Sequence, residues 1–434
     1  MNFAPIPPND FPEFISTYFE RCRARVPHIE AIAGKWTLED LIPGLSDFDV
    51  RFIVREPLTA QGWCTMAMEV ANVHSQLALE RKDWARNLEH LPGVNLSWSE
   101  LLDPKSYYPE FAQWSFYHGP PEKIKAFKEM ISSRAWDEVE TAYHWKKIAI
   151  YYGAYDRKID PAINLGPYEN KYPLHSRVMH YLAPPIHSLV CLHEGKTGPG
   201  KTEAFRRARE LFPNQATMEE VLSLIARHYE APHYLVEPGL SELDKSLEIY
   251  LREATNSVFC NQSWLRCKPN PTRDELKAAI HESAGEQGIS QLFELVKFAR
   301  LMKGRLWFYA RDVAWFDSAP LIRNEMNRLR ANFYEQPLQL FARHCLLQPL
   351  DAEGCLRELE GTLLSPASVQ ACRAFAALAD PSCPDAELKN VAAQIVEIYE
   401  PFLEAMETVV QAAMLQCCIN KTMSYVRLPK SALI

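Results

Sequence analysis

Two aspartates, Asp47 and Asp49, stand two residues apart in the stretch PGLSDFDV. The run 47–54, DFDVRFIV, is rich in β-branched and aromatic residues and stops before Pro57, which predicts a β-strand. Because side chains alternate along a strand, both carboxylates are expected on one face. Like charges there are destabilising unless they are neutralised. A magnesium ion bound with a substrate phosphate neutralises them and prepares a nucleotide for attack at phosphorus. Two solvated aspartates would leave the same pattern.

A second motif, GKTGPGKT at 195–202, fits the phosphate-loop pattern G-x-x-x-x-G-K-[ST]. In a phosphate loop this motif joins a buried parallel strand to a helix, and backbone N–H groups surround the phosphates. The residues after it read as a helix, but the region around it lacks the alternating strands of a parallel sheet. Two alternatives follow: a phosphate loop, and a helix–helix turn broken by Gly-Pro-Gly.

The elements that position these motifs change in character near residue 120. Before it, the spacing predicts a helix over 14–25, a short apolar step at 29–33, strands over 47–54, 94–102 and 111–119, and a helix over 60–90. After it, helical spacing covers 121–152, 174–194, 202–212, 217–229, 240–256, 274–303, 321–346 and 385–419, while 305–316 fits a strand or an aromatic helix. The fold class expected is α+β: a small mixed sheet domain followed by a large all-helical region.

The stretch AGKWTLEDLIPGLSDFDVRF resembles the signature of the polymerase-β-like nucleotidyltransferases, and most closely that of the aminoglycoside adenylyltransferases. That signature has a strand ending in Gly-Ser, a turn that often contains proline, and Ser-Asp-x-Asp on the next strand. The resemblance implies that Asp47 and Asp49 bind the metal ions and act in catalysis. It also implies that Gly34 and Lys35, with Ser46 nearby, line the triphosphate site.

The same resemblance gives the second motif another meaning. In these adenylyltransferases a helical domain follows the catalytic one and carries an apolar helix, a turn, and a lysine that begins the next helix. SLVCLHEGKTGPGKTEAFRRARELFP is similar to that pattern, and Lys201 falls at the lysine. The resemblance implies that Lys201 reaches the nucleotide phosphates across the domain cleft. A cation near a helix N-terminus suits an anion in either fold.

The chain departs from the family pattern at two positions. Lys35 stands where the family has serine, and Asn95 stands at the position expected for a third carboxylate. An amide cannot take a proton from an attacking hydroxyl. Glu100 and Asp103 are the nearby substitutes. Alternatively, the base comes from the helical domain, the acceptor is already an anion, or the domain no longer catalyses.

Composition sets the broader limits. The 434 residues are 47% hydrophobic and carry a net charge of −8, which argues against general binding to a nucleic-acid backbone. The eleven cysteines form no CxxC pair, and the N-terminus lacks the pattern of a secretory signal, so we expect a reduced, cytoplasmic protein with mostly buried thiols. No apolar stretch reaches the roughly 18 residues of a membrane helix.

Other residues that could do chemistry have an ordinary structural explanation. The histidines in 175–193, at 175, 180, 187 and 193, are spaced by five, seven and six residues, whereas a helical zinc pair needs three or four. The basic and aromatic segment 144–158 could stack a base, but it fits an amphipathic helix with a solvated basic face better.

These observations predict three units: a nucleotidyltransferase-like catalytic domain at 1–120, a helical domain closing the nucleotide cleft at 121–230, and a helical domain of unassigned role at 231–434. The function expected is Mg²⁺-dependent transfer of a nucleotidyl group from a nucleoside triphosphate, with ATP favoured, to a small acceptor. The alternatives are a non-catalytic nucleotide-binding relative and a phosphate-loop NTPase that uses 195–202. The acceptor and the oligomeric state stay open.

Overall fold

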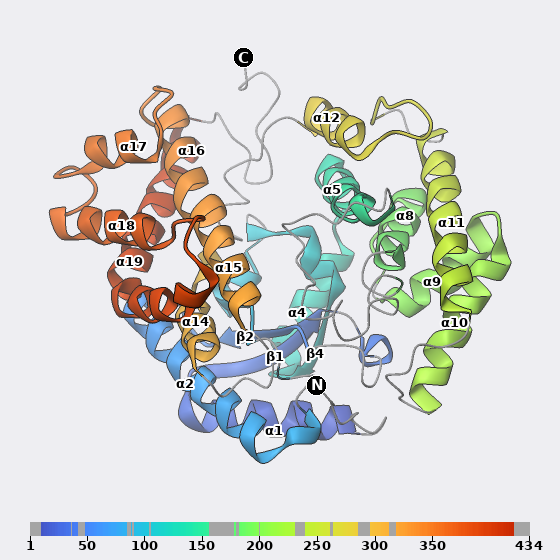
Figure 1. Ribbon diagram of the computed structural model, residues 1–434, viewed down its shortest axis with the longest axis horizontal. Helices are drawn as coiled ribbons and strands as arrows, with labels where there is room; N and C mark the ends of the chain where they lie inside the picture. Colours follow the sequence, from blue (N-terminus) through green and yellow to red (C-terminus); the bar gives the residue numbers. More distant parts are fainter. Residues whose placement is uncertain are drawn as a thin grey trace.

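The computed structural model describes residues 10–35, 37–41, 48–84, 88, 91–103, 106–155, 178, 182–198, 200–230, 239–260, 264–284, 296–311 and 318–420. Its elements form three groups (Figure 1). A four-stranded sheet with its helices comes from the front of the chain, and the middle and C-terminal helices lie on opposite sides of it in this view. The protein is therefore α+β, with a small mixed sheet and a large helical remainder.

The sheet has the order β3-β2-β1-β4, in which β1 is antiparallel to both neighbours and β2 is parallel to β3. Its strands are β1 (Ile29–Lys35), β2 (Val50–Val54), β3 (Val94–Ser97) and β4 (Trp114–His118). The two faces follow from the alternation along β2. Phe52 belongs to the core shared with the C-terminal helices, whereas Ile53 belongs to a smaller core on the other face.

The front helices cover the two faces of this sheet. Helix α1 (Asp10–Arg25) buries Phe11, Phe14, Ile15, Tyr18, Phe19 and Cys22, whose spacing of three and one places them on one stripe. Helix α2 (Ala60–Glu80) is capped by Thr59, whose side chain accepts a hydrogen bond from the Gly62 N–H. Helix α4 (Pro121–Ser132) lies on the other face, where Phe127 joins the smaller core.

A second core is built entirely from the middle of the chain, between Trp145 and Ile280. Its helices are α5 (Glu138–Tyr155), α8 (Pro184–Glu194), α9 (Lys201–Leu211), α10 (Gln215–Glu230), α11 (Leu240–Cys260) and α12 (Arg273–Ala284). The predicted domain boundary at residue 230 falls between α10 and α11, which pack on each other within this core.

The C-terminal helices pack back onto the front of the chain. They are α14 (Met302–Ala310), α15 (Ala319–Arg328), a π-helical stretch (Leu329–Glu335), α16 (Gln336–His344), α17 (Ala352–Leu359), α18 (Pro366–Leu378) and α19 (Leu388–Asn420). Helix α14 contacts both α2 and α19, so one core extends from Phe11 to Ala413. Gly304 allows the close approach, because a Cβ there would lie 2.3 Å from the backbone oxygen of Ala67 in α2.

Most expected elements are present, with shifted ends. The segment 94–102 is a strand only as far as Ser97, because the Ser97 and Glu100 side chains form a capping box that begins the short helix α3 (Trp98–Leu101). The described part of 305–316 is helical, in α14. The eight cysteines described as free include five that are buried. None of the described helices combines the length and apolar character that crossing a bilayer requires.

Candidate functional site

Charged side chains gather on one face of the sheet at the ends of β1 and β2. Arg51 pairs with Ala33 across the two strands, and the Lys35 N–H donates to the Asp49 carbonyl oxygen at 3.3 Å. The Asp49 carboxylate lies 3.9 Å from the Arg51 guanidinium, and 52% of the Asp49 side chain is exposed. This exposed carboxylate, beside the Arg51 guanidinium, is the described part of the predicted acidic pair. Ser46 and Asp47 lie outside the described residues.

A third strand end adds a carboxylate that the sequence did not single out. Glu110 lies on the 3-10 turn η4 (Pro109–Gln113), which leads into β4. It accepts a hydrogen bond from Arg51 Nη2 at 2.7 Å, and its other oxygen lies 3.5 Å from Lys35 Nζ. Burial alone would raise the pKa of Glu110, but Lys35 and Arg51 hold it well below the ordinary value. Glu110 is therefore ionised and occupied by its two cations.

Helix α5 brings a lysine from the middle domain to the same face. Burial and the neighbouring Lys35 ammonium lower the pKa of Lys147, while Glu110 acts in the opposite direction. Two lysines and one arginine thus surround one carboxylate. The segment 144–158 was expected to be an amphipathic helix with a solvated basic face. Its described part is helical, but Lys147 is half-buried against the sheet domain.

The motif at 195–202 connects two helices. Gly195 is the left-handed C-cap of α8, with φ of 64°, so the strand that a phosphate loop needs is absent and this alternative is overturned. At the other end of the motif, Asp40 Oδ1 accepts hydrogen bonds from the Thr202 N–H at 2.7 Å and from its hydroxyl at 2.9 Å. Asp40 follows β1 on the turn η1 (Leu38–Asp40). The helix N-terminus is therefore occupied by a carboxylate of the protein itself.

Lys201 and Gly34, both expected to contact the triphosphate, lie in different elements: Lys201 in α9 and Gly34 in β1. Lys201 is the first residue of α9, directly before Thr202. Gly34 lies in β1 beneath Tyr117, whose ring would be 2.6 Å from a Cβ at this position. A side chain at position 34 would displace the Tyr117 ring, so Gly34 has a packing role that is independent of any role for its backbone at a phosphate.

Asn95 lies on the face opposite to Asp49. In the parallel pairing of β2 and β3, Arg51 stands opposite Val94 and Phe52 opposite Asn95, so Asn95 points toward the core shared with the C-terminal helices. It is fully buried there. The prediction that position 95 faces the aspartate pair is therefore wrong. The misplacement is one residue in register, which moves a side chain to the other face of the sheet.

Glu100, named as a possible substitute, belongs to a different network. Its carboxylate accepts two hydrogen bonds from Arg300, at 2.8 and 3.0 Å, and a third from the Ser97 N–H at 2.7 Å. Arg300 also donates to Glu407 of α19 at 3.0 Å. This buried network joins the front domain to the last helix, so Glu100 serves as an anchor between them.

The C-terminal helices also place a cation within electrostatic range of Asp49. Arg305 of α14 pairs with Glu325 at 2.6 Å. Burial acts to lower the pKa of Arg305, but Glu325 and, among others, Asp49 hold it above the ordinary value. The exposed Asp49 carboxylate thus lies within the electrostatic range of cations from the sheet and from the C-terminal helices.

This face can bind an anion through several cationic side chains. It can also bind a hard cation through one exposed carboxylate. We name the set Lys35, Asp49, Arg51, Glu110 and Lys147 the charged face. Carboxylate oxygen is the ligand that Mg²⁺ prefers, and phosphate oxygens complete its shell in nucleotide sites, so Asp49 fits the role of a magnesium ligand. Comparisons with family models, with curated proteins and with solved structures find no match to this chain.

Proposed function

We propose that the protein is a Mg²⁺-dependent nucleotidyltransferase that binds a nucleoside triphosphate between the sheet and α5. The observation that carries the proposal is the approach of Lys35 and Lys147, two like charges from separate domains, beside the exposed carboxylate of Asp49. Glu110 offsets only part of the charge of Lys35, Arg51 and Lys147, and like charges held together are costly unless a further anion joins them. A triphosphate supplies that anion, and ATP is the favoured nucleotide.

Each residue has a separate role in this proposal. Lys35 and Lys147 bind phosphate oxygens as point charges, and Arg51 orients the site through its contacts with Asp49 and Glu110. Asp49, with Asp47, would hold Mg²⁺, which neutralises phosphate charge when it is bound. Lys201, at the start of α9, approaches the phosphates from the middle domain.

The reaction proposed forms one bond and breaks another. An acceptor oxygen attacks the α-phosphorus, and the bond from that phosphorus to the bridging oxygen breaks, so that pyrophosphate leaves with its electron pair. Glu110 is a poor general base because Lys35 and Arg51 keep its pKa low. An acceptor that is already an anion, such as a phosphate or a carboxylate, loses no proton in the attack and fits this site best.

A second candidate function rests on the same ion pairs. Glu110 is the other carboxylate described on the charged face, and it is occupied by Lys35 and Arg51. A nucleotide-binding protein without catalytic activity would have this arrangement. Its helical regions would then serve in interactions.

Binding is tested by thermal shift with ATP, CTP, GTP and UTP, each with and without Mg²⁺. The proposal expects one nucleotide to raise the melting temperature of the wild type only with Mg²⁺, because a ligand stabilises the state that binds it. Asp49→Asn and Lys147→Met should lose the shift. Lys125→Met, which removes an exposed lysine of α4, should keep it. Equal shifts in all variants would place the nucleotide elsewhere.

Catalysis is tested with the nucleotide that binds. Incubation with Mg²⁺ and a panel of anionic acceptors should release pyrophosphate, and an α-phosphate label should move to one acceptor. Asp49→Asn should abolish both signals. Binding without pyrophosphate release across phosphate, phosphonate and carboxylate acceptors would favour the non-catalytic candidate.

A further inference from the structure

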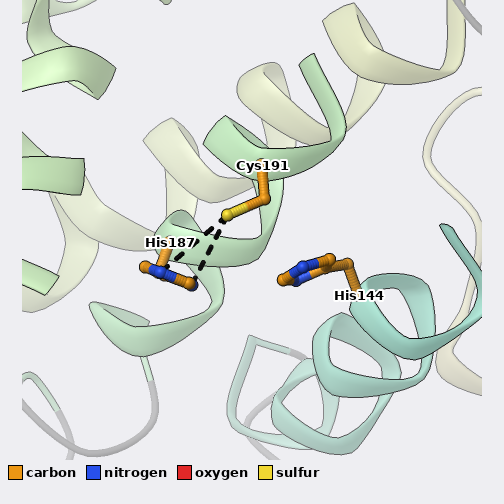
Figure 2. A group of neighbouring side chains, drawn as sticks. All are labelled: His144, His187 and Cys191. Carbon is orange, nitrogen blue, oxygen red and sulfur yellow. Dashed lines mark hydrogen bonds between the residues drawn. The ribbon is translucent and has the colours of Figure 1, made fainter. Parts of the chain in front are cut away.

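A cluster of metal-ligand side chains lies inside the middle domain, within electrostatic range of Lys147 of the charged face. His144 comes from α5, and His187 and Cys191 come from one face of α8 (Figure 2). All three side chains are buried, and one ligand atom from each lies within 4.8 Å of the others. The spacing of four between His187 and Cys191 is the spacing that places two ligands on one side of a helix. The histidine spacings alone missed this site because its partners are a cysteine and a residue of another helix.

We infer that His144, His187 and Cys191 form a binding site for a thiophilic transition metal, for which Zn²⁺ is the natural probe. Imidazole nitrogen and thiolate sulfur are ligands that zinc accepts, and three protein ligands with a fourth position for water or another ligand make an open tetrahedral site. Mg²⁺ prefers oxygen and is not expected here. The inference is independent of the proposed function.

The hydrogen bonds around His187 prepare one nitrogen for a metal. His187 Nε2 lies 3.0 Å from the backbone oxygen of Gly198. A carbonyl oxygen only accepts, so Nε2 carries the proton and Nδ1 holds the lone pair. Cys191 Sγ lies 3.8 Å from each of the two ring nitrogens, so it is within reach of the one that holds the lone pair. A ring N–H bonded to a backbone carbonyl is the arrangement that orients metal-bound histidines.

His144 is held by two hydroxyl groups. Its Nδ1 lies 3.1 Å from Ser188 Oγ and its Nε2 lies 3.2 Å from Thr197 Oγ1. Hydroxyls donate or accept, so either nitrogen of His144 can present a lone pair. Thr197 stands at the border of the cluster, where its hydroxyl or a water molecule can fill the fourth position.

The two histidines are in the protonation state that binds a metal, whereas the thiol of Cys191 must first lose its proton. Burial lowers the pKa of His187 to about 4 and lowers that of His144, so both rings are neutral at neutral pH. Burial raises the pKa of Cys191 to about 12, so the free site holds a thiol. Metal binding would release that proton, and the resulting thiolate would offset one positive charge.

The distances require a modest contraction. Zinc bonds of about 2.0–2.3 Å in tetrahedral geometry place ligand atoms roughly 3.3–3.8 Å apart, so atoms that lie within 4.8 Å of one another need to close by at most about 1–1.5 Å. Rotation of the side chains supplies this movement, because His144 on α5 and the other two residues on α8 project toward one another. The site would then fasten α5 to α8 and to the segment around Gly198, which leads into Lys201.

The experiment uses the full-length protein with its affinity tag removed. Metal content is measured after purification without chelators, and the stripped protein is titrated with Zn²⁺ and with Co²⁺. We expect one equivalent of Zn²⁺, about one proton released per ion, and a rise in melting temperature of about 2–4 °C. The Co²⁺ complex should show a thiolate charge-transfer band, which can be measured on the wild-type protein alone.

Variants separate this site from others. Cys191→Ser and His187→Gln should lose the Zn²⁺ response and the charge-transfer band. Cys372→Ser, which removes a buried thiol of α18, and Asp49→Asn, which alters the charged face, should keep both. Absence of Zn²⁺ binding by the wild type, or an unchanged thiolate band in Cys191→Ser, would overturn the inference and leave a metal-free hydrogen-bonded cluster.

Discussion

The carboxylate of Asp40 binds Thr202 across the boundary between the sheet domain and the middle domain. One oxygen accepts from the N–H and hydroxyl of Thr202, and the other accepts from the N–H and hydroxyl of Thr37. Gly200 makes room for this contact, because a Cβ there would lie 2.8 Å from Asp40 Oδ2. The glycine and threonine of the phosphate-loop match thus serve a carboxylate of the same chain.

Asp40→Asn should lower the free energy of unfolding by about 1–3 kcal/mol, because a buried charged acceptor of four hydrogen bonds is lost. Urea denaturation measures this change. Adding Thr202→Val to Asp40→Asn should cost less than the sum of the single changes, with a coupling of about 1 kcal/mol. Asp351→Asn, which alters the cap of α17 in the C-terminal region, provides the control and should be additive with Thr202→Val.

Glu110→Gln should destabilise the fold and strengthen anion binding at once. Lys35 and Arg51 lose their common partner, so stability should fall by about 2–4 kcal/mol. Calorimetry with pyrophosphate should show an affinity raised roughly three- to tenfold, and Lys147→Met should shift it the other way. Glu122→Gln, an exposed change on α4, should leave the affinity unaltered. Weaker binding in Glu110→Gln would contradict the charged face as an anion site.

Glu140 should make stability fall as pH rises. Burial, first, and then the neighbouring Asp137 raise its pKa to about 7, while Arg134 and Tyr107 also face it. The folded state therefore binds more protons than the unfolded state between about pH 4.5 and 7. The contribution of Glu140 to the free energy of unfolding is lost as the pH rises through that interval. Urea denaturation at several pH values measures this effect. Between pH 5 and pH 8, the free energy of unfolding of Glu140→Gln should rise relative to that of the wild type by about 1–3 kcal/mol. Parallel pH profiles would refute this assignment.

Gly304→Ala should separate α14 from α2. The added Cβ would meet the backbone of Ala67, which cannot turn aside as a side chain can. Overpacking of this kind costs about 1–3 kcal/mol. Gly198→Ala is the matched control, since a Cβ there meets nothing within 4 Å and should change stability by less than about 0.5 kcal/mol. Equal melting temperatures for the two variants would argue against the close helix contact.

The spacing of apolar residues predicted most of the strands and helices, because a buried stripe such as that of α1 repeats within a few residues of sequence. The register between β2 and β3 depends on pairing of distant residues, and it placed Asn95 on the unexpected face. Glu110 and Lys147 were missed because each looks like an ordinary polar residue until η4 and α5 meet the sheet. The phosphate-loop match was resolved by α8, whose apolar residues suit a buried helix as well as a strand.

The core that joins Phe11 to Ala413 has a consequence for synthesis of the chain. The sheet and α2 leave the ribosome early, yet α14, the first of the two C-terminal helices that cover α2, begins about 220 residues after α2 ends. At roughly 5–20 residues per second, that apolar surface waits roughly 10–40 s for its partner. The middle helices, whose core closes between Trp145 and Ile280, complete themselves in the meantime. The first part made is thus the last to be finished, and a nascent chain arrested before α14 presents a surface for chaperones.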